Sequence, residues 1–131
     1  MRRLQTLFLP HPVAEIHIPW GEDTLSAISQ RHDVRVFDRQ QDATPQFHGV
    51  EAVVDLGGNI TPELVDVAAR AGVKFVQVRT NGLDHVEVDK IKQTGMRLAH
   101  CPGLLSSVAL AEAAMMFMLM HARTLLRGST E

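Results

Sequence analysis

Short apolar runs alternate with helix-like segments along the whole chain, and this alternation constrains the fold more than any other feature. The runs with strand character are residues 4–9, 33–37, 51–56, 73–78 and 96–100. The turns between the elements are only a few residues long. Strands that alternate with helices in this way form a parallel sheet covered on both faces. We therefore predict an α/β fold of the flavodoxin type, a doubly wound, five-stranded parallel sheet with a long C-terminal helix.

The clearest helix start is Thr61-Pro62-Glu63. Thr61 offers an N-cap oxygen, Pro62 suits the first helical position, and Glu63 places a carboxylate in the first turn. This helix is expected to end before Gly72. A second helix is expected within residues 22–32 with Asp23 or Thr24 as its cap, and a short one over 88–94 that Gly95 closes.

The last helical segment, from Val108 to about Arg127, is apolar on nearly every side. In VALAEAAMMFMLM (108–120) only Glu112 is charged, so covering one face of its own sheet would leave a second apolar face in water. Ser106 or Ser107 is the expected N-cap. A helix central to its own domain is one interpretation, and we favour contact with a second domain or subunit. We predict a domain over residues 1–105, a long helix over 106–131, and a homodimer through residues 108–126.

Composition and charge exclude several functions. The formal net charge is -2 and no block rich in Lys or Arg occurs, so nucleic acid is not an expected partner. No apolar run approaches the roughly 20 residues of a membrane span. The single cysteine, Cys101, cannot form an internal disulfide, which agrees with a reducing compartment. We therefore expect a cytoplasmic protein that binds neither nucleic acid nor membrane.

The familiar signatures of cofactor and metal sites are absent. No G-x-G-x-x-G turn occurs, and GGNITPE lacks the lysine of a phosphate loop. The 7 histidines show no metal-ligand spacing, so we expect no metal site. Cys101 is expected to be an inert thiol. Asp55 at a strand end suggests the phosphoacceptor of a receiver domain, but the first strand lacks the acidic residues of receivers, so Asp55 is expected to organise a turn.

The stretch VRTNGLDHVEV (78–88) is the best candidate for a binding loop. Gly82 allows either close approach of a ligand or a positive φ, and the amides around Asn81 and Gly82 could form an anion-binding concavity. The alternative is an ordinary Asn-Gly turn in which Asp84 caps the next helix. Spacing alone favours that alternative.

From Val73 to about Leu126 the chain resembles the D-isomer-specific 2-hydroxyacid dehydrogenases. The matching stretches are NGLDHVEV, IKQTGMRLAHCPG and SSVALAE, in the family's order and at nearly its spacing. Residues 1–72 match only in the order of their elements. Two departures are one additional residue between Pro102 and Glu112, and Glu87 in place of the usual Asp.

The resemblance implies that the backbone at Asn81 and Gly82 binds the substrate carboxylate, and that Ser106 borders the same pocket. In the family, NAD or NADP binds a following Rossmann domain, and the catalytic Arg, Glu and His come from beyond this stretch. We therefore expect the substrate-binding half of a dehydrogenase that acts on a small 2-keto or 2-hydroxy acid. It has no catalytic residue of its own, binds no cofactor tightly and is inactive alone. The alternative is a non-enzymatic flavodoxin-like module that dimerises or regulates a partner.

Overall fold

The computed structural model describes residues 1–13 and 20–123, and the chain divides into two compact units, Met1–Cys101 and Pro102–Glu131. The first unit contains a five-stranded sheet in the order β2-β1-β3-β4-β5, and every neighbouring pair is parallel. This confirms the predicted fold class, and each strand lies within its predicted run. The strands are β1 Gln5–Leu9, β2 Asp33–Val36, β3 Ala52–Asp55, β4 Phe75–Val78 and β5 Arg97–His100.

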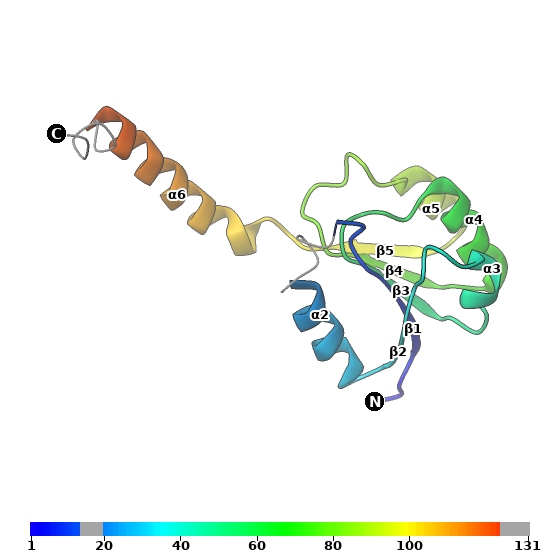
Figure 1. Cartoon of the computed structure of the whole chain (residues 1–131). Helices are drawn as coiled ribbons and strands as arrows, with labels where there is room; N and C mark the ends of the chain where they lie inside the picture. The colour runs from blue at the N-terminus through cyan, green and yellow to red at the C-terminus, as the bar shows by residue number, and fades with distance from the viewer. Residues whose placement is uncertain (14–19, 124–131) are drawn as a thin grey trace. The chain divides into compact units, whose positions relative to one another are not determined.

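The strand order places helices on both faces of the sheet. From β1 the chain moves one way to β2 through α2 (Trp20–Ser29), and it then returns past β1 towards β5. Because crossovers between parallel strands are right-handed, this reversal puts α2 on one face and the later helices on the other. Figure 1 shows α3 (Ala43–Gln46), α4 (Pro62–Ala71) and α5 (Val88–Gln93) gathered on the side of the sheet away from α2.

The core lies between the sheet and the face formed by α4 and α5. Strand residues of alternating position point to this face, and the ladder aligns Leu7 with Val53 and Val53 with Val76. Burying each such side chain contributes about 1.5–3 kcal/mol, so this layer fixes the helices on the strands. The buried cluster includes Leu7, Leu9, Val53, Val76 and Val78 of the strands, with Leu64, Val65, Ala68 and Ile91 of the helices.

Helix α4 begins and ends as predicted. The Thr61 Oγ1 accepts a hydrogen bond from the Leu64 N–H at 3.4 Å, and Gly72 closes the helix in the left-handed region with φ 85°. The pKa of the Glu63 carboxyl lies below its ordinary value, because the carboxylate accepts a hydrogen bond from its own backbone N–H and another from the Thr61 side chain. Helix α4 thus gives the loop before it a fixed end.

Two other helix starts differ from prediction. Helix α2 already begins at Trp20, so Asp23 and Thr24 lie inside it and neither is its cap. The Thr24 hydroxyl instead donates to the Trp20 carbonyl at 2.7 Å, which is a bond back to the preceding turn. Helix α3 was not predicted, and Asp42 caps it by accepting a hydrogen bond from the Thr44 N–H at 3.3 Å.

The second unit contains the predicted long helix, α6 (Leu104–Ala122). The expected cap at Ser106 or Ser107 is wrong, because both lie inside the helix and their hydroxyls donate to the Gly103 and Leu104 carbonyls at 3.4 and 3.3 Å. The expected end near Arg127 lies outside the described residues. Within residues 1–13 and 20–123, no helix is long and apolar enough to cross a membrane. The domain boundary after residue 105 stays a prediction.

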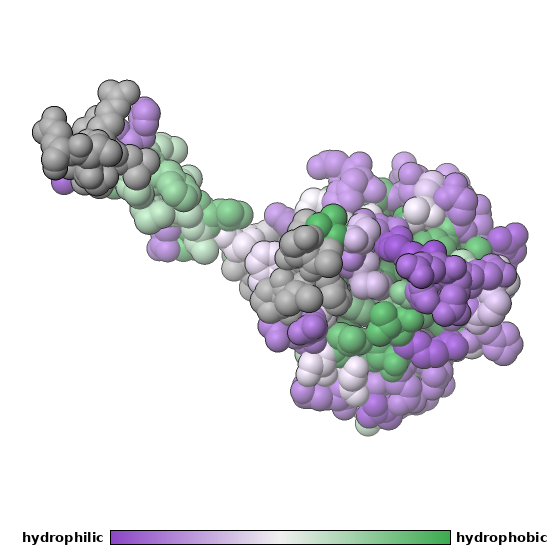
Figure 2. All heavy atoms as spheres, viewed as in Figure 1, coloured by the Kyte–Doolittle hydropathy of each residue, from purple (hydrophilic) through white to green (hydrophobic). Residues whose placement is uncertain are grey.

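Helix α6 exposes apolar side chains along its length. Figure 2 shows hydrophobic residues covering most of its visible face. The exposed set is Leu104, Val108, Leu110, Met115, Met116, Phe117, Met118 and Leu119. An apolar helix that its own unit leaves exposed requires a cover from elsewhere.

Asp55 at the end of β3 is completely buried and organises the following turn, as predicted. One carboxylate oxygen accepts from the Gly57 N–H at 3.2 Å and the other from the Ile60 N–H at 2.8 Å. Its backbone carbonyl accepts from the Arg79 N–H at 2.9 Å, which ties the end of β3 to the end of β4. One residue thus fixes both loops at this edge.

We predict that Asp55→Ala lowers the free energy of unfolding by about 2–4 kcal/mol, because it leaves two N–H groups without their charged acceptor. Asp55→Asn keeps one acceptor oxygen and should cost roughly half as much. Urea unfolding measures both. Asp23→Ala, at an exposed position of α2, is the control and should cost below about 0.5 kcal/mol. A loss no larger than this control in Asp55→Ala would contradict the role assigned to the carboxylate.

Candidate carboxylate-binding site

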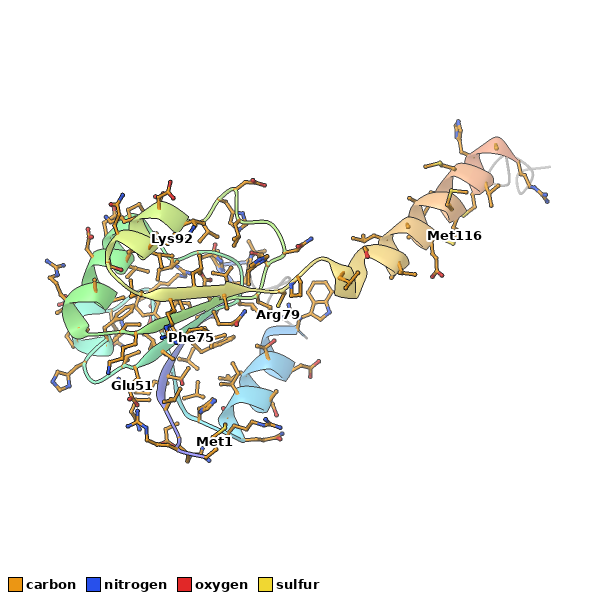
Figure 3. The ribbon with its side chains drawn as sticks, turned by 180° about the vertical axis from the view of Figure 1, so that it is seen from behind. Met1, Glu51, Phe75, Arg79, Lys92 and Met116 are labelled. Carbon is orange, nitrogen blue, oxygen red and sulfur yellow. The ribbon has the colours of Figure 1, made fainter. Side chains whose placement is uncertain are left out.

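The candidate site lies where the strands of the first unit end. Parallel strands bring their carboxyl ends to one edge, and ligands of such sheets bind there. Figure 3 shows Arg79, which follows β4, at the edge opposite Glu51, which precedes β3. The β4 loop (residues 79–87) carries Asn81 and Gly82, and both are exposed.

Hydrogen bonds hold two consecutive carbonyls of the β4 loop. The Asn81 carbonyl lies 3.1 Å from Nδ1 of His100, and the Gly82 carbonyl accepts from the Thr80 hydroxyl at 2.9 Å. A carbonyl oxygen can only accept, so Nδ1 of His100 carries the proton in this contact. In a trans peptide the N–H points opposite to the C=O. The N–H of Gly82 is therefore directed away from His100.

The amides of this segment are open to a ligand. In the part of the chain that the structure describes, the N–H groups of Asn81, Gly82 and Leu83 donate to no protein acceptor. Exposed N–H groups without a protein acceptor bind water or a ligand. Successive amides of this kind form a concavity that suits an anion. The arrangement can hold a carboxylate, and its neutral donors perform no redox step.

The structure decides between the two roles foreseen for Gly82. Its φ is not positive, so that expectation is wrong, and a Cβ added there would lie 3.7 Å from the nearest side-chain atom, Oδ2 of Asp84. The role of Gly82 in close approach of a ligand stays a prediction. The alternative in which Asp84 caps α5 is also wrong, because Glu87 occupies the cap position and makes no side-chain cap bond. The turn in this loop lies at residues 83–86, where the Val86 N–H donates to the Leu83 carbonyl at 2.9 Å.

The β3 loop (residues 56–61) is packed between two histidines. A Cβ on Gly57 would lie 2.4 Å from Cδ2 of His11, and a Cβ on Gly58 would lie 2.3 Å from Nε2 of His85. Gly58 also has φ +69°. Nε2 of His85 lies 3.2 Å from the Gly57 carbonyl, which joins the β4 loop to the β3 loop. A side chain on either glycine would therefore require a neighbouring side chain to shift.

Side chains lie close to both glycines of this pair. A dinucleotide turn uses glycines to let a pyrophosphate approach the backbone. Here His11 and the Asn59 amide occupy the space beside Gly57, and His85 occupies the space beside Gly58. The Asn59 Nδ2 is buried and has no hydrogen-bond partner within the described residues. No group of three metal-ligating side chains occurs among residues 1–13 and 20–123.

Of the predicted site residues, Asn81 and Gly82 are neighbours on the β4 loop, and Ser106 belongs to the second unit. The role of Ser106 at the pocket stays a prediction. Two residues of the site were not foreseen, His85 and His100. Each acts on a backbone carbonyl far away in sequence, by 28 and 19 residues, so no local pattern could reveal the contact.

A sequence model of the D-isomer specific 2-hydroxyacid dehydrogenase family, catalytic domain, matches residues 13–130. The chain belongs to this family. No curated protein sequence matches the chain significantly.

Solved structures of dehydrogenases share this fold at low sequence identity. The apo form of D-lactate dehydrogenase from Escherichia coli superposes with TM-score 0.61 at 19% identity, over 96% of this chain and 39% of that one. The pyruvate reductase of Chlamydomonas reinhardtii gives 0.64 at 18%, over 95% and 38%. A glyoxylate reductase from Paecilomyes thermophila gives 0.63 at 19%, over 92% and 38%. The chain thus spans about two fifths of the length of these relatives.

We predict that Gly58→Ala destabilises the first unit far more than Gly49→Ala. Both residues have positive φ, 69° and 73°, so both variants meet the backbone strain of a left-handed residue. Only at position 58 would the new Cβ meet a neighbour, because nothing lies within 4 Å at position 49. Overpacking of this kind costs about 1–3 kcal/mol in addition. Thermal or urea unfolding of both variants measures the difference.

The source of that difference can be tested in a double variant. Adding His85→Ala to Gly58→Ala removes the ring that the Cβ meets, so part of the lost stability should return. Equal losses in Gly58→Ala and Gly49→Ala, or strictly additive losses in the double variant, would show that His85 does not constrain the β3 loop.

Proposed function

We propose that this chain is the substrate-binding part of an NAD(P)-dependent oxidoreductase that interconverts small 2-keto acids and 2-hydroxy acids. The substrate carboxylate binds the N–H groups of Asn81 and Gly82. The proposal is supported by one observation. The N–H groups of residues 81–83 donate to no acceptor within the described residues, and hydrogen bonds hold the carbonyls of Asn81 and Gly82. The names of the three structural relatives support the substrate class, because lactate, pyruvate and glyoxylate are all small 2-hydroxy or 2-keto acids.

The proposal divides the reaction between this chain and groups outside it. Reduction of a keto acid needs a hydride donor and a proton donor as well as a carboxylate site. The β4 loop is the proposed carboxylate site, and the sequence has no G-x-G-x-x-G turn for a nucleotide. NAD or NADP is therefore proposed to bind outside the described residues. This chain alone is proposed to be inactive, and the protein is proposed to be cytoplasmic. The rival, a non-enzymatic module, requires no response of the β4 loop to a keto acid.

The test is a titration of the 15N-labelled 131-residue chain with pyruvate, followed by the amide resonances of Asn81 and Gly82. We expect both resonances to shift, and acetone, which lacks the carboxylate, to leave them in place. Asn81→Ala keeps the backbone N–H and should bind about as well as the wild type. Gly82→Val fills the space through which the carboxylate approaches and should weaken binding by roughly ten-fold or more, the worth of one bond to a charged acceptor.

The same variants separate a binding role from a structural one. Because a Cβ at position 82 makes only an ordinary contact, Gly82→Val should melt close to the wild-type temperature. If the amide resonances do not respond to pyruvate, or if folded Gly82→Val binds as the wild type does, the carboxylate does not bind this loop.

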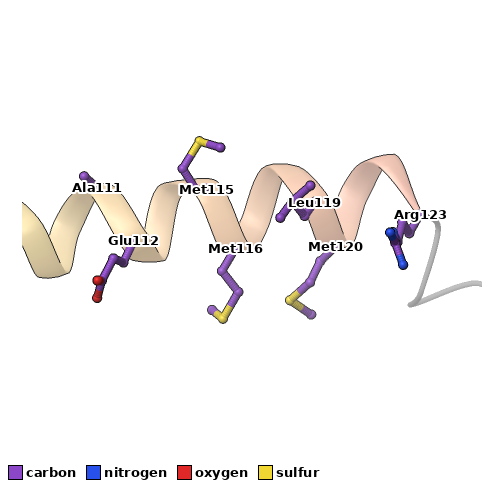
Figure 4. A pocket seen from close by; sticks show the side chains of 7 residues that line it. All are labelled: Ala111, Glu112, Met115, Met116, Leu119, Met120 and Arg123. Carbon is purple, nitrogen blue, oxygen red and sulfur yellow. The ribbon is translucent and has the colours of Figure 1, made fainter.

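We also propose that the chain forms a homodimer through residues 108–126, of which 108–123 are described. Figure 4 shows Glu112, Met116 and Met120 on one side of α6, at the edge of an apolar groove. Apolar side chains are exposed on the other sides of this helix too, including Leu110 and Phe117. An apolar surface of this extent on a helix is typical of a subunit contact, and a second copy supplies a matching surface.

Sedimentation of the wild type and of a Met116→Lys, Met120→Lys variant tests the dimer. Two ammonium groups on one side of α6 would have to lose water in the contact, so the variant should dissociate at concentrations at which the wild type is dimeric. Gln40→Lys with Gln93→Lys adds the same charge at exposed positions of the first unit and should leave the dimer intact. A wild type that stays monomeric at high concentration would refute the proposal.

A further inference from the structure

We infer that His100 is the positioning residue of the carboxylate site. Its Nδ1–H holds the Asn81 carbonyl and thereby aims the Gly82 N–H at the substrate. This inference rests on the proposed function, because it assigns a task to a residue that the substrate itself does not have to touch. Neither the sequence nor the family resemblance had given His100 a role.

The backbone of His100 provides a rigid anchor. His100 is the last residue of β5 and is paired with Val78 of β4 in the ladder. The next residue continues the connection, because the Cys101 N–H donates to the Thr80 carbonyl at 3.3 Å. The imidazole therefore extends from the sheet, whereas Asn81 and Gly82 lie exposed on a loop. A hydrogen bond between them transfers the order of the strand to the loop.

Gly82 explains why such an anchor is needed. Without a Cβ, Gly82 can rotate about φ more freely than any other residue. That freedom lets the Asn81–Gly82 peptide turn over, and its N–H would then point away from the ligand. Because the peptide is planar, holding its C=O also fixes its N–H. Gly82 leaves space for the carboxylate, and the hydrogen bond from His100 restricts the rotation of the Asn81–Gly82 peptide that a glycine permits.

The contact specifies which atom must donate. Only Nδ1 of the ring faces the Asn81 carbonyl. An asparagine at position 100 has its Nδ2 the same number of bonds from the backbone as Nδ1 of histidine. A glutamine carries its amide one bond further out, nearer the place of Nε2. The histidine can therefore be replaced by asparagine without loss of the contact, and not by glutamine or alanine.

The test is the pyruvate titration repeated on His100→Asn, His100→Gln and His100→Ala, with the Gly82 amide as the probe. We expect His100→Asn to bind within about two-fold of the wild type, and the other two variants to bind roughly five- to ten-fold more weakly, because the bond to a charged acceptor loses its alignment. All three should melt near the wild-type temperature, because His100 is exposed. His48→Ala, at an exposed histidine outside the loop, is the control and should bind as the wild type does.

The outcomes separate this inference from the proposed function. If the amide resonance of Gly82 in the wild type does not shift with pyruvate, the proposed carboxylate site is wrong, and the positioning role of His100 is wrong with it. If the wild type responds and His100→Ala binds equally well, the site stands and the positioning role fails. If His100→Gln restores binding as fully as His100→Asn, alignment through Nδ1 is wrong. Recovery by asparagine alone would support the inference, since a merely structural residue would change melting and not discriminate these donors.

Discussion

The carboxylate of Asp55 is the interaction on which the functional edge of the sheet depends. It is fully buried, and its two oxygens fold the β3 loop back so that Gly57 and Ile60 donate to one side chain. Its backbone carbonyl at the same time receives the Arg79 N–H, where the β4 loop begins. The two loops therefore leave the sheet from a common point. A further contact between the two loops is that of Nε2 of His85 with the Gly57 carbonyl at 3.2 Å.

Glycines at this edge serve different physical purposes. Gly58 needs both its positive φ and its missing Cβ, because the His85 ring lies where the Cβ would be. Gly82 has no positive φ, and the space beside its exposed amide is open. The sequence motif Asn81-Gly82 is typical of a tight turn, and the turn lies two residues later, at 83–86. The Asn81-Gly82 pair itself is therefore not the point of chain reversal.

The sequence predicted those features that local chemistry controls. The strands follow from short apolar runs, and α4 follows from the oxygen of Thr61, the proline after it and the glycine at its end. Where local signals are weak the prediction failed: Asp23 and Thr24 are ordinary positions inside α2, and α3 has only a single turn. The site followed the same rule. Family resemblance could point to Asn81 and Gly82. The hydrogen bonds from His85 and His100 to backbone carbonyls depend on segments that are distant in sequence and adjacent in the fold.

The β4 loop and helix α6 share one physical property. Amides without acceptors and apolar side chains without cover are both groups that folding ordinarily satisfies. On the β4 loop, water competes with the proposed carboxylate for the exposed amides, so the net gain per bond is modest and two such bonds alone would give weak binding. The direction of each N–H is then decisive, because an N–H that points away from the carboxylate contributes nothing to the binding free energy. The proposed site consists of neutral donors beside a flexible glycine, and the contact from His100 at the end of β5 would hold one of its peptides in place.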